Sequence, residues 1–366
     1  MIKFLDLQKV NERFQNEFQE KFKSFLDSGH YILGDQVSSF ENNYAKYCGV
    51  EYCVGVSNGL DALILIFKAY LKLGLLQCHD EILVPANTFI GSVLAIEETG
   101  LKPVLIEPDL ETYNISVLEI EKNITPKTKA ILAVHLYGML ADMESINIIA
   151  KKNNLLVIED AAQAHGAVDK YGVMAGALSD VAAFSFYPSK NLGALGDAGA
   201  VVSNNEALIH MIKKLRNYGG LSKYVYDIVG SNNRLDEVQA IFLNVKLKLL
   251  DEDNKLRRNI AKLYLSGITN KKVSLPYYNS SNNHVFYAFV VLVKNRQDFI
   301  DYLNRKKIET LIHYPIPPHK QRAFSHLKFA NLPITETIHN RIVSLPMSPV
   351  MLRDEVEEVI KAINLY

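Results

Sequence analysis

Two short segments each place a reactive side chain directly after an apolar run. Asp160 ends the run VIED at 157–160, and small residues follow it. Lys190 lies in SFYPSKNLGALGDAG at 185–199, where an apolar run breaks and glycines follow. Ligands of open α/β sheets bind outside the carboxyl ends of strands. If both runs are strands, a nucleophilic amine and a carboxylate beside room for a flat ligand would meet at one edge of a sheet.

Each residue also has a simpler interpretation. An aspartate in this place can cap the helix that follows, and most lysines of soluble proteins are solvated surface residues. Lys190, however, has mostly short or apolar neighbours rather than acids. Burial in such a setting favours the neutral amine, which is the nucleophilic form. It is the wider context that favours chemistry at these two positions.

The segment GVSNGLDA at 55–62 has the character of a phosphate site. Ser57, Asn58 and Gly59 form a polar turn before a helix expected from about Leu60. The free N–H groups and the dipole of a helix N-terminus bind anions. No GKS or GKT follows, so the segment is not a P-loop, and the glycines after Lys190 do not match the dinucleotide fingerprint. A Rossmann oxidoreductase is therefore disfavoured.

A fourth polar segment, GSNNRLDEVQA at 230–240, places Asn232 just before another expected helix. Its simpler interpretation is a helix N-terminus, in which Asp236 and Glu237 complement the dipole. Alone, the segment identifies no ligand.

The elements that must position these residues alternate between short strands and helices. Several strands are apolar throughout, which is typical of strands buried on both faces of a mostly parallel sheet. Strands are expected at 50–56, 81–84, 103–106, 130–135, 155–159, 181–186 and 199–203. Helices are expected at 11–28, 36–47, 60–73, 89–99, 116–123, 142–153 and 205–217. The pattern predicts an α/β fold.

The pattern changes after about residue 235. One long helix is expected at 236–264, then a strand at 285–293, a helix at 297–306 and a final helix at 351–363. A single hydrophobic core stops growing at roughly 250–300 residues. The sequence therefore predicts an N-terminal arm and larger α/β domain over 1–245, and a smaller C-terminal α+β domain over 246–366.

Composition excludes several classes of partner. The 366 residues carry 40 basic and 40 acidic side chains, so no basic excess exists to bind nucleic acid. No signal peptide and no membrane association are expected, because no stretch reaches the roughly 18 apolar residues that span a bilayer. Three cysteines, at 48, 53 and 78, do not have zinc-site spacing. A cytoplasmic protein with reduced thiols and no metal is expected.

Taken together, the segments resemble the DegT/DnrJ/EryC1/StrS family of sugar aminotransferases. The resemblance covers nearly the whole chain, through FLDL, GVSNGLDAL, VPANTFI, VHLYG at 134–138, VIEDAAQAHGA, SFYPSKNLGALGDAG, RNYGG at 216–220, NNRLDEVQA and SLPMSP at 344–349. It implies the aspartate aminotransferase-like fold (fold type I), with a mostly parallel seven-stranded sheet flanked by helices. It also implies pyridoxal 5′-phosphate (PLP), which needs a lysine, an acid and a phosphate site.

The resemblance assigns roles around the cofactor ring. Lys190 would bond to the cofactor aldehyde and, once freed, act as the base. Asp160 would stay ionised against the ring nitrogen. Gln163 would hydrogen-bond the 3′-oxygen, while Ala162 and Phe89 would pack on the two ring faces. Family members that dehydrate sugars carry histidine at the lysine position, so the lysine favours transamination.

The resemblance also assigns the phosphate site and the assembly. Ser57, Asn58, Gly59 and Ser185 would hold the phosphate. Asn232 would reach that phosphate from the neighbouring subunit, which implies a homodimer with shared active sites.

The substrate site is implied by LIHYPIPPHKQ at 311–321, which resembles the loop of members that aminate C3 of a dTDP-3-keto-6-deoxyhexose. Tyr187, His313 and Tyr314 would line the sugar pocket, with His165 nearby. The simpler interpretation of His313 and Tyr314 is a packed loop stiffened by prolines.

The resemblance thus implies a PLP-dependent transaminase that moves an amino group from L-glutamate to the C3 ketone of a dTDP-3-keto-6-deoxyhexose, giving a dTDP-3-amino-3,6-dideoxyhexose. Two alternatives stay open: amination of a UDP- or dTDP-4-keto sugar at C4, and a non-catalytic PLP-binding regulatory module. Lys190, Asp160 and Gln163 argue against the module. The galacto or gluco configuration at C4, the amino donor and a tetrameric assembly also stay open.

Overall fold

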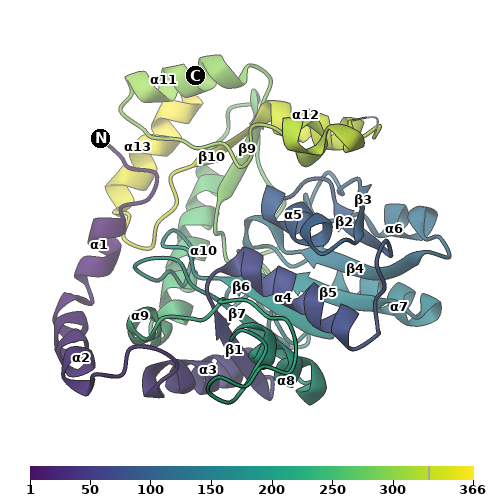
Figure 1. Ribbon diagram of the computed structural model, residues 1–366. Coiled ribbons are helices and arrows are strands. Elements are labelled where there is room, and N and C mark those ends of the chain that lie inside the picture. The colour runs from purple at the N-terminus through teal and green to yellow at the C-terminus, as the bar shows by residue number, and fades with distance from the viewer. Residues whose placement is uncertain (329) are drawn as a thin grey trace.

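A seven-stranded sheet forms the centre of the larger part of the protein (Figure 1). The computed structural model describes residues 1–328 and 330–366. The strands are β1 (Tyr52–Val56), β2 (Glu81–Pro85), β3 (Lys102–Ile106), β4 (Thr128–Val134), β5 (Leu156–Asp160), β6 (Val181–Ser185) and β7 (Gly199–Ser203). They lie in the order β1-β7-β6-β5-β4-β2-β3. Strand β7 pairs antiparallel with β1 and β6, and the other pairs are parallel. The predicted mostly parallel seven-stranded sheet is confirmed.

Helices cover both faces of this sheet. One face packs against α4 (Gly59–Lys72), α5 (Ile90–Glu98) and α8 (Glu206–Leu215); the other packs against α3 (Asp35–Cys48), α6 (Val117–Asn123) and α7 (Met143–Asn153). Along β4, Leu132 joins the first core, whereas Ile131 and Ala133 join the second. Because successive side chains of a strand point to opposite faces, a strand covered on both sides is apolar throughout.

A smaller α+β unit follows. Its helices are α10 (Leu250–Gly267), α11 (Arg296–Arg305), α12 (Pro333–Arg341) and α13 (Arg353–Asn364), and its sheet has the order β10-β9-β8, with β8 (Val273–Ser274), β9 (Phe289–Val293) and β10 (Ile342–Leu345). Short 3₁₀ helices are η1 (Leu136–Gly138), η2 (Pro318–Lys320) and η3 (Arg322–Leu327). Nowhere in the described part of the chain does a helix have the length and apolar character needed to cross a membrane.

The start of the chain lies against this smaller unit. Ile2 packs in its core with Phe289 and Phe299, and the Ile2 backbone N–H donates to the Lys307 carbonyl at 2.8 Å. These first residues were predicted to belong to the larger domain. The division at residue 245 stays a prediction, and it falls near the C-terminal end of a helix.

Two helices that the sequence predicts as single are broken. The helix expected at 236–264 forms α9 (Glu237–Leu247) and α10, and the helix expected at 11–28 forms α1 (Leu7–Glu12) and α2 (Gln15–Ser28). Helix α9 packs on phenylalanines of the N-terminal helices, whereas the second half of α10 packs in the smaller unit. One straight helix cannot bury apolar faces in both cores. The signal for the break was Asp251–Asp253, an acidic first turn typical of a helix start.

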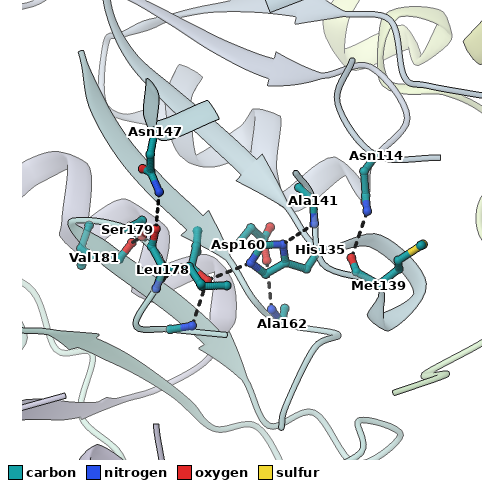
Figure 2. A network of polar contacts seen from close by, with 12 residues as sticks. Asn114, His135, Met139, Ala141, Asn147, Asp160, Ala162, Leu178, Ser179 and Val181 are labelled. Carbon is teal, nitrogen blue, oxygen red and sulfur yellow. Dashed lines mark hydrogen bonds and ion pairs between the residues drawn. The ribbon is translucent and has the colours of Figure 1, made fainter. Parts of the chain in front are cut away.

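Glu159 ties a loop to the end of β5, next to Asp160. The fully buried carboxylate accepts hydrogen bonds from the N–H groups of Gly176 at 2.8 Å and Leu178 at 3.0 Å, and from the Ser179 hydroxyl at 2.8 Å. The fourth donor is His135 Nε2 at 2.8 Å. Figure 2 shows His135 between Ala141 and the turn of Leu178 and Ser179. The Ala141 N–H donates to His135 Nδ1, so Nε2 carries the proton.

Replacing Glu159 with glutamine is therefore expected to destabilise the fold. In one orientation the new amide NH₂ would face His135 and Gly176, and in the other it would face Leu178 and Ser179. His135 cannot invert its tautomer without losing the hydrogen bond from Ala141. Each buried donor left without an acceptor costs about 1–3 kcal/mol. Chemical denaturation measures the loss of unfolding free energy. Glu357→Gln, at an exposed carboxylate of α13, is the control and should leave the midpoint unchanged. Equal midpoints for both variants would contradict the anchoring role.

Candidate active site

A cavity of about 450 Å³ opens at the carboxyl ends of several strands, beside residues of the smaller unit. This volume suits a small ligand, since such sites occupy about 300–1,000 Å³. Its lining consists of Asn58, Gly59, Leu60, Leu63, Phe89, Gly91, Ser92, Asp160, Ala162, Ser185, Tyr187, Ser189, Lys190, Asp197, Tyr287, His313 and Tyr314. The sheet edge that the sequence pattern indicated is therefore where the candidate residues gather.

Lys190 lies in the turn that follows β6. Its backbone N–H donates to the Tyr187 carbonyl at 2.8 Å, and its Nζ lies 4.5 Å from the centre of the Tyr287 ring. The next residue, Asn191, donates from Nδ2 to Asn254 at 2.8 Å and to the Val285 carbonyl at 3.1 Å. The turn that carries the lysine is therefore anchored to Asn254 and Val285, and a ring face lies beside the amine.

Asp160 ends β5 and is 9% exposed. Its Oδ2 accepts from the Ser92 hydroxyl at 2.8 Å, and its Oδ1 accepts from the Ala162 N–H at 3.2 Å. Figure 2 shows the second of these contacts. These two donors hold the carboxyl group of Asp160 in one orientation.

The N-terminus of α4 forms another wall. Asn58 caps the helix by accepting from the Asp61 N–H at 2.8 Å. The N–H groups of the first two residues, Gly59 and Leu60, have no acceptor within the helix. A Cβ at Gly59 would lie 2.6 Å from the Ser185 Cβ, so glycine is required for this close approach. The wall therefore presents free N–H donors, a hydroxyl and a positive helix end to the cavity.

Aromatic side chains close another side. Gln163 accepts from the Tyr137 N–H at 2.6 Å through Oε1, and it donates from Nε2 to the Tyr314 hydroxyl at 3.0 Å. Phe89 and Tyr314 have ring centres 5.2 Å apart. The Tyr137 hydroxyl donates to the His313 carbonyl at 2.7 Å. This closing side therefore joins strand ends of the larger unit to a loop of the smaller one.

His313 and Tyr314 are both neutral at ordinary pH. Burial, assisted by the positive charge of Lys190, lowers the pKa of His313 to about 4. Burial raises the pKa of Tyr314 well above its usual value. A neutral imidazole and a phenol can each donate or accept a hydrogen bond. They can therefore bind sugar hydroxyl groups.

Four predicted site residues do not line the cavity. Gln163 lies behind the lining and contacts it through Tyr314. His165 is fully buried, 5.4 Å from the Phe184 ring and 5.5 Å from the Phe186 ring, so its place near a sugar stays a prediction. Ser57 turns its hydroxyl to Asp61 instead. Asn232 is exposed and outside the cavity of its own chain, so its role across a subunit boundary stays a prediction.

Ser92, Tyr287 and Asp197 line the cavity but were not predicted from the sequence. Ser92 follows Phe89 by three residues, a spacing that places both on one side of a helix, and this signal was available. Tyr287 was read as part of a strand that in fact begins at Phe289. No local signal pointed to Asp197. No group of three or more potential metal ligands is arranged to hold an ion among residues 1–328 and 330–366.

Known proteins are similar in sequence to this chain over its whole length. The model of the DegT/DnrJ/EryC1/StrS aminotransferase family matches residues 12–364. The chain belongs to this family. The dTDP-3-amino-3,6-dideoxy-alpha-D-galactopyranose transaminase of Aneurinibacillus thermoaerophilus is 55% identical, over 100% of this chain and 99% of that relative. The dTDP-3-amino-3,4,6-trideoxy-alpha-D-glucose transaminase of Streptomyces venezuelae is 40% identical, over 99% of this chain and 95% of that one.

Solved structures share the fold of this chain. The crystal structure of S. venezuelae DesV in complex with a ketimine intermediate has a TM-score of 0.95 and 40% identity, and the match covers 100% of this chain and 98% of that one. A family member from Brucella abortus has a TM-score of 0.92 and 32% identity, over 99% and 98% of the two chains. The predicted fold type I architecture is confirmed.

PLP is the cofactor of this aminotransferase family. The residues present fit it. The α4 wall, where a Cβ at Gly59 would collide with Ser185, provides donors for a phosphate. Asp160 offers a carboxylate for a ring nitrogen, and Lys190 offers an amine for an aldehyde. All three features line one cavity.

Four buried histidines are expected to make this family member sensitive to acid. Burial lowers the pKa of His165 and His284 to about 3, and of His313 and His339 to about 4. The unfolded chain binds their protons near pH 6.5, so between pH 6.5 and 4 it holds more protons than the folded chain. Stability should therefore fall as pH drops, by up to about 1.4 kcal/mol per pH unit for each histidine.

Chemical denaturation at a series of pH values measures this slope. His165→Phe should make the slope shallower, because the side chain already packs between aromatic rings. His30→Phe, at an exposed histidine, is the control and should leave the slope unchanged. A slope that His165→Phe does not alter would contradict this origin.

Proposed function

We propose that this protein transfers an amino group from L-glutamate to the C3 ketone of a dTDP-3-keto-6-deoxyhexose, giving a dTDP-3-amino-3,6-dideoxyhexose. The observation that carries the proposal is 55% identity, over the whole chain, to the Aneurinibacillus enzyme named for such an amino sugar. That name specifies a galactopyranose, so the galacto epimer is the proposed preferred substrate. The cavity supports the proposal, because it brings an amine, a carboxylate and a helix N-terminus together.

In this proposal, Lys190 and Asp160 handle protons. PLP, when bound, supplies an aldehyde that reacts with amines and a ring that withdraws electrons. Asp160 keeps a proton on the ring nitrogen, and this proton preserves the electron demand of the ring. Lys190 Nζ removes and returns the proton at the carbon that loses or gains the amino group. Tyr287 limits the movement of Nζ, since its ring face lies 4.5 Å away.

The other residues of the site are proposed to hold and orient the cofactor. The N–H groups of Gly59 and Leu60, with the Ser185 hydroxyl, bind the phosphate. Gln163 uses Oε1 for Tyr137 and one Nε2 hydrogen for Tyr314, so its second Nε2 hydrogen is the one available for the ring oxygen. Ala162 and Phe89 are proposed to contact the two ring faces.

Sugar binding is assigned to neutral groups. Tyr187, His313 and Tyr314 line the same cavity as Lys190. His313 Nδ1 lies 2.8 Å from the Ser344 hydroxyl, and this contact fixes the ring and leaves Nε2 for a substrate hydroxyl. Because His313 and Tyr314 are uncharged, they are proposed to recognise sugar hydroxyl groups through hydrogen bonds. The direction of each bond depends on the configuration of the carbon that carries the hydroxyl.

Product identification tests the proposal. The purified protein with PLP and L-glutamate is given the galacto and gluco epimers of the 3-keto sugar and, separately, a 4-keto sugar, and the products are identified by NMR. Amination at C3, with the galacto epimer used faster, is expected. Amination of the 4-keto sugar alone would contradict the proposal in favour of the C4 alternative. PLP binding with no amination of any sugar would favour the regulatory module.

We further propose a homodimer with shared active sites. Asn232 is exposed, and the neighbouring loop exposes Tyr224, Val225 and Val229. A cluster of exposed apolar side chains is typical of an interaction surface. In the dimer, Asn232 of the partner subunit would complete the phosphate site.

Complementation between inactive variants tests whether the two subunits share their active sites. Lys190→Ala damages the site of its own chain, whereas Asn232→Ala damages the site of the other chain. A mixed dimer therefore retains one intact site, and random exchange should restore up to about a quarter of the wild-type activity. Mixed variants that exchange subunits but stay inactive would contradict shared sites. Light scattering gives the mass of the assembly independently.

A further inference from the structure

Two buried hydroxyl groups lie in series behind Asp160. Ser92 Oγ lies 2.8 Å from Asp160 Oδ2, and Thr88 Oγ1 lies 2.8 Å from Ser92 Oγ. Ser92 and Thr88 are each 1% exposed. Phe89 lies between them in the chain, and its proposed contact with the cofactor ring requires neither hydroxyl.

Chemistry fixes the direction of the protons. An ionised carboxylate only accepts hydrogen bonds, so the Ser92 O–H donates to Asp160. That bond uses the single proton of Ser92, so its oxygen is the acceptor for the Thr88 O–H. Both protons therefore point along one chain toward the carboxylate. Successive hydrogen bonds polarise one another, and the effect is largest where water is excluded.

The position of Ser92 on α5 separates this contact from an ordinary helix contact. Serines inside helices often bond to a carbonyl of the preceding turn. Ser92 instead reaches across to β5, 68 residues away in the chain. Phe89 lies one turn earlier and lines the same cavity. A single helix end thus places an aromatic ring and a donor to the carboxylate in one site.

We propose that Ser92 is a positioning residue for the reaction, and that Thr88 acts through it. The Ser92 hydroxyl holds the Asp160 carboxylate in the rotamer that faces the cavity. Asp160 then keeps the proton on the cofactor ring nitrogen more firmly. This inference rests on the proposed function, because it takes the role of Asp160 from it.

Ser92→Ala is the first test. The variant removes a hydrogen bond to a charged group, so kcat should fall by about tenfold to a hundredfold. The KM for the sugar should change little, since Asp160 does not contact it. The pH midpoint of the absorption change of the bound cofactor should move up by about one unit. A cofactor ring that keeps its positive charge less firmly repels the proton on the Lys190 nitrogen less. That nitrogen therefore keeps its proton up to a higher pH.

Three further variants sharpen the test. Ser92→Thr retains the hydroxyl and should restore kcat and the absorption midpoint to near the wild-type values. Thr88→Val removes the outer link without touching Asp160, so it should move the midpoint in the same direction by less. Ser203→Ala, at the end of β7, removes another buried hydroxyl, which donates to the Asp180 carbonyl. It controls for the loss of packing and should leave the midpoint unchanged.

The outcomes separate this inference from its alternatives. A Ser92→Ala protein with a lowered melting temperature but the wild-type absorption midpoint would overturn the positioning role, because only a structural role would remain. If Ser92→Ala does not fold, Thr88→Val decides by the same absorption measurement. The cofactor titration needs no sugar, so a wrong sugar assignment would leave its result intact.

Discussion

Replacing Lys190 with alanine is expected to abolish amino transfer while leaving the fold intact. Lys190 is the one lysine that lines the cavity in the described part of the chain. Loss of a proton-transfer group alone costs about 10²- to 10⁴-fold in rate, and the covalent role of the amine adds to this loss. Steady-state amination of the keto sugar with L-glutamate measures the effect. A circular dichroism melt should be close to that of the wild type, since Lys190 is only half-buried.

Two controls separate the chemistry of Lys190 from its charge. Lys190→Arg keeps a cation near Tyr287, but a guanidinium does not give up its proton at ordinary pH, so this variant should be equally inactive. Lys248→Ala, at an exposed lysine of the surface, should retain full activity. Wild-type turnover by Lys190→Ala would remove the basis of the proposed function.

The second large effect is expected for Asp160→Asn. The amide has nearly the same shape as the carboxylate, but it carries no charge to hold a proton on the ring nitrogen. Loss of an electrostatic partner of the reacting system typically costs about 10²- to 10³-fold in kcat. The variant should also lose PLP faster on dialysis, and the decay of cofactor absorption measures this. Both losses follow from one missing charge.

Asp160→Glu supplies the matched comparison. It keeps the charge but moves it by one methylene, away from the Ser92 and Ala162 donors. Its activity should lie between those of the wild type and Asp160→Asn. If the asparagine variant turned over as fast as the wild type, Asp160 would be a structural residue of the strand end.

The strands could be predicted because their apolar pattern depends only on residues that are neighbours in the sequence. Every strand of the large sheet was predicted within a few residues, since strands covered on both faces are apolar from end to end. That correct pattern placed Asp160 and Lys190 at one edge of the sheet. The motif around each residue then supplied the family, which the comparisons confirmed.

Some predictions failed where contacts between distant parts of the chain decide the local structure. The helix predicted at 236–264 breaks because its halves serve different cores. The strand predicted from residue 285 starts only at Phe289, and this shift releases Tyr287 toward Lys190. The full burial of His165 beside Phe184 and Phe186 was also not predicted. None of these contacts is local in sequence.

By itself, the amino-acid sequence determined the fold class and the chemical groups of the candidate site. Both depend on patterns within a few residues, namely apolar runs and the polar residues at their ends. Only the tertiary structure decided how those groups are arranged. The contact of Gln163 with Tyr314 spans 151 residues, and that of Ser92 with Asp160 joins a helix to a strand. Such contacts form because the sheet buries its faces, and no local pattern encodes which side chains then meet.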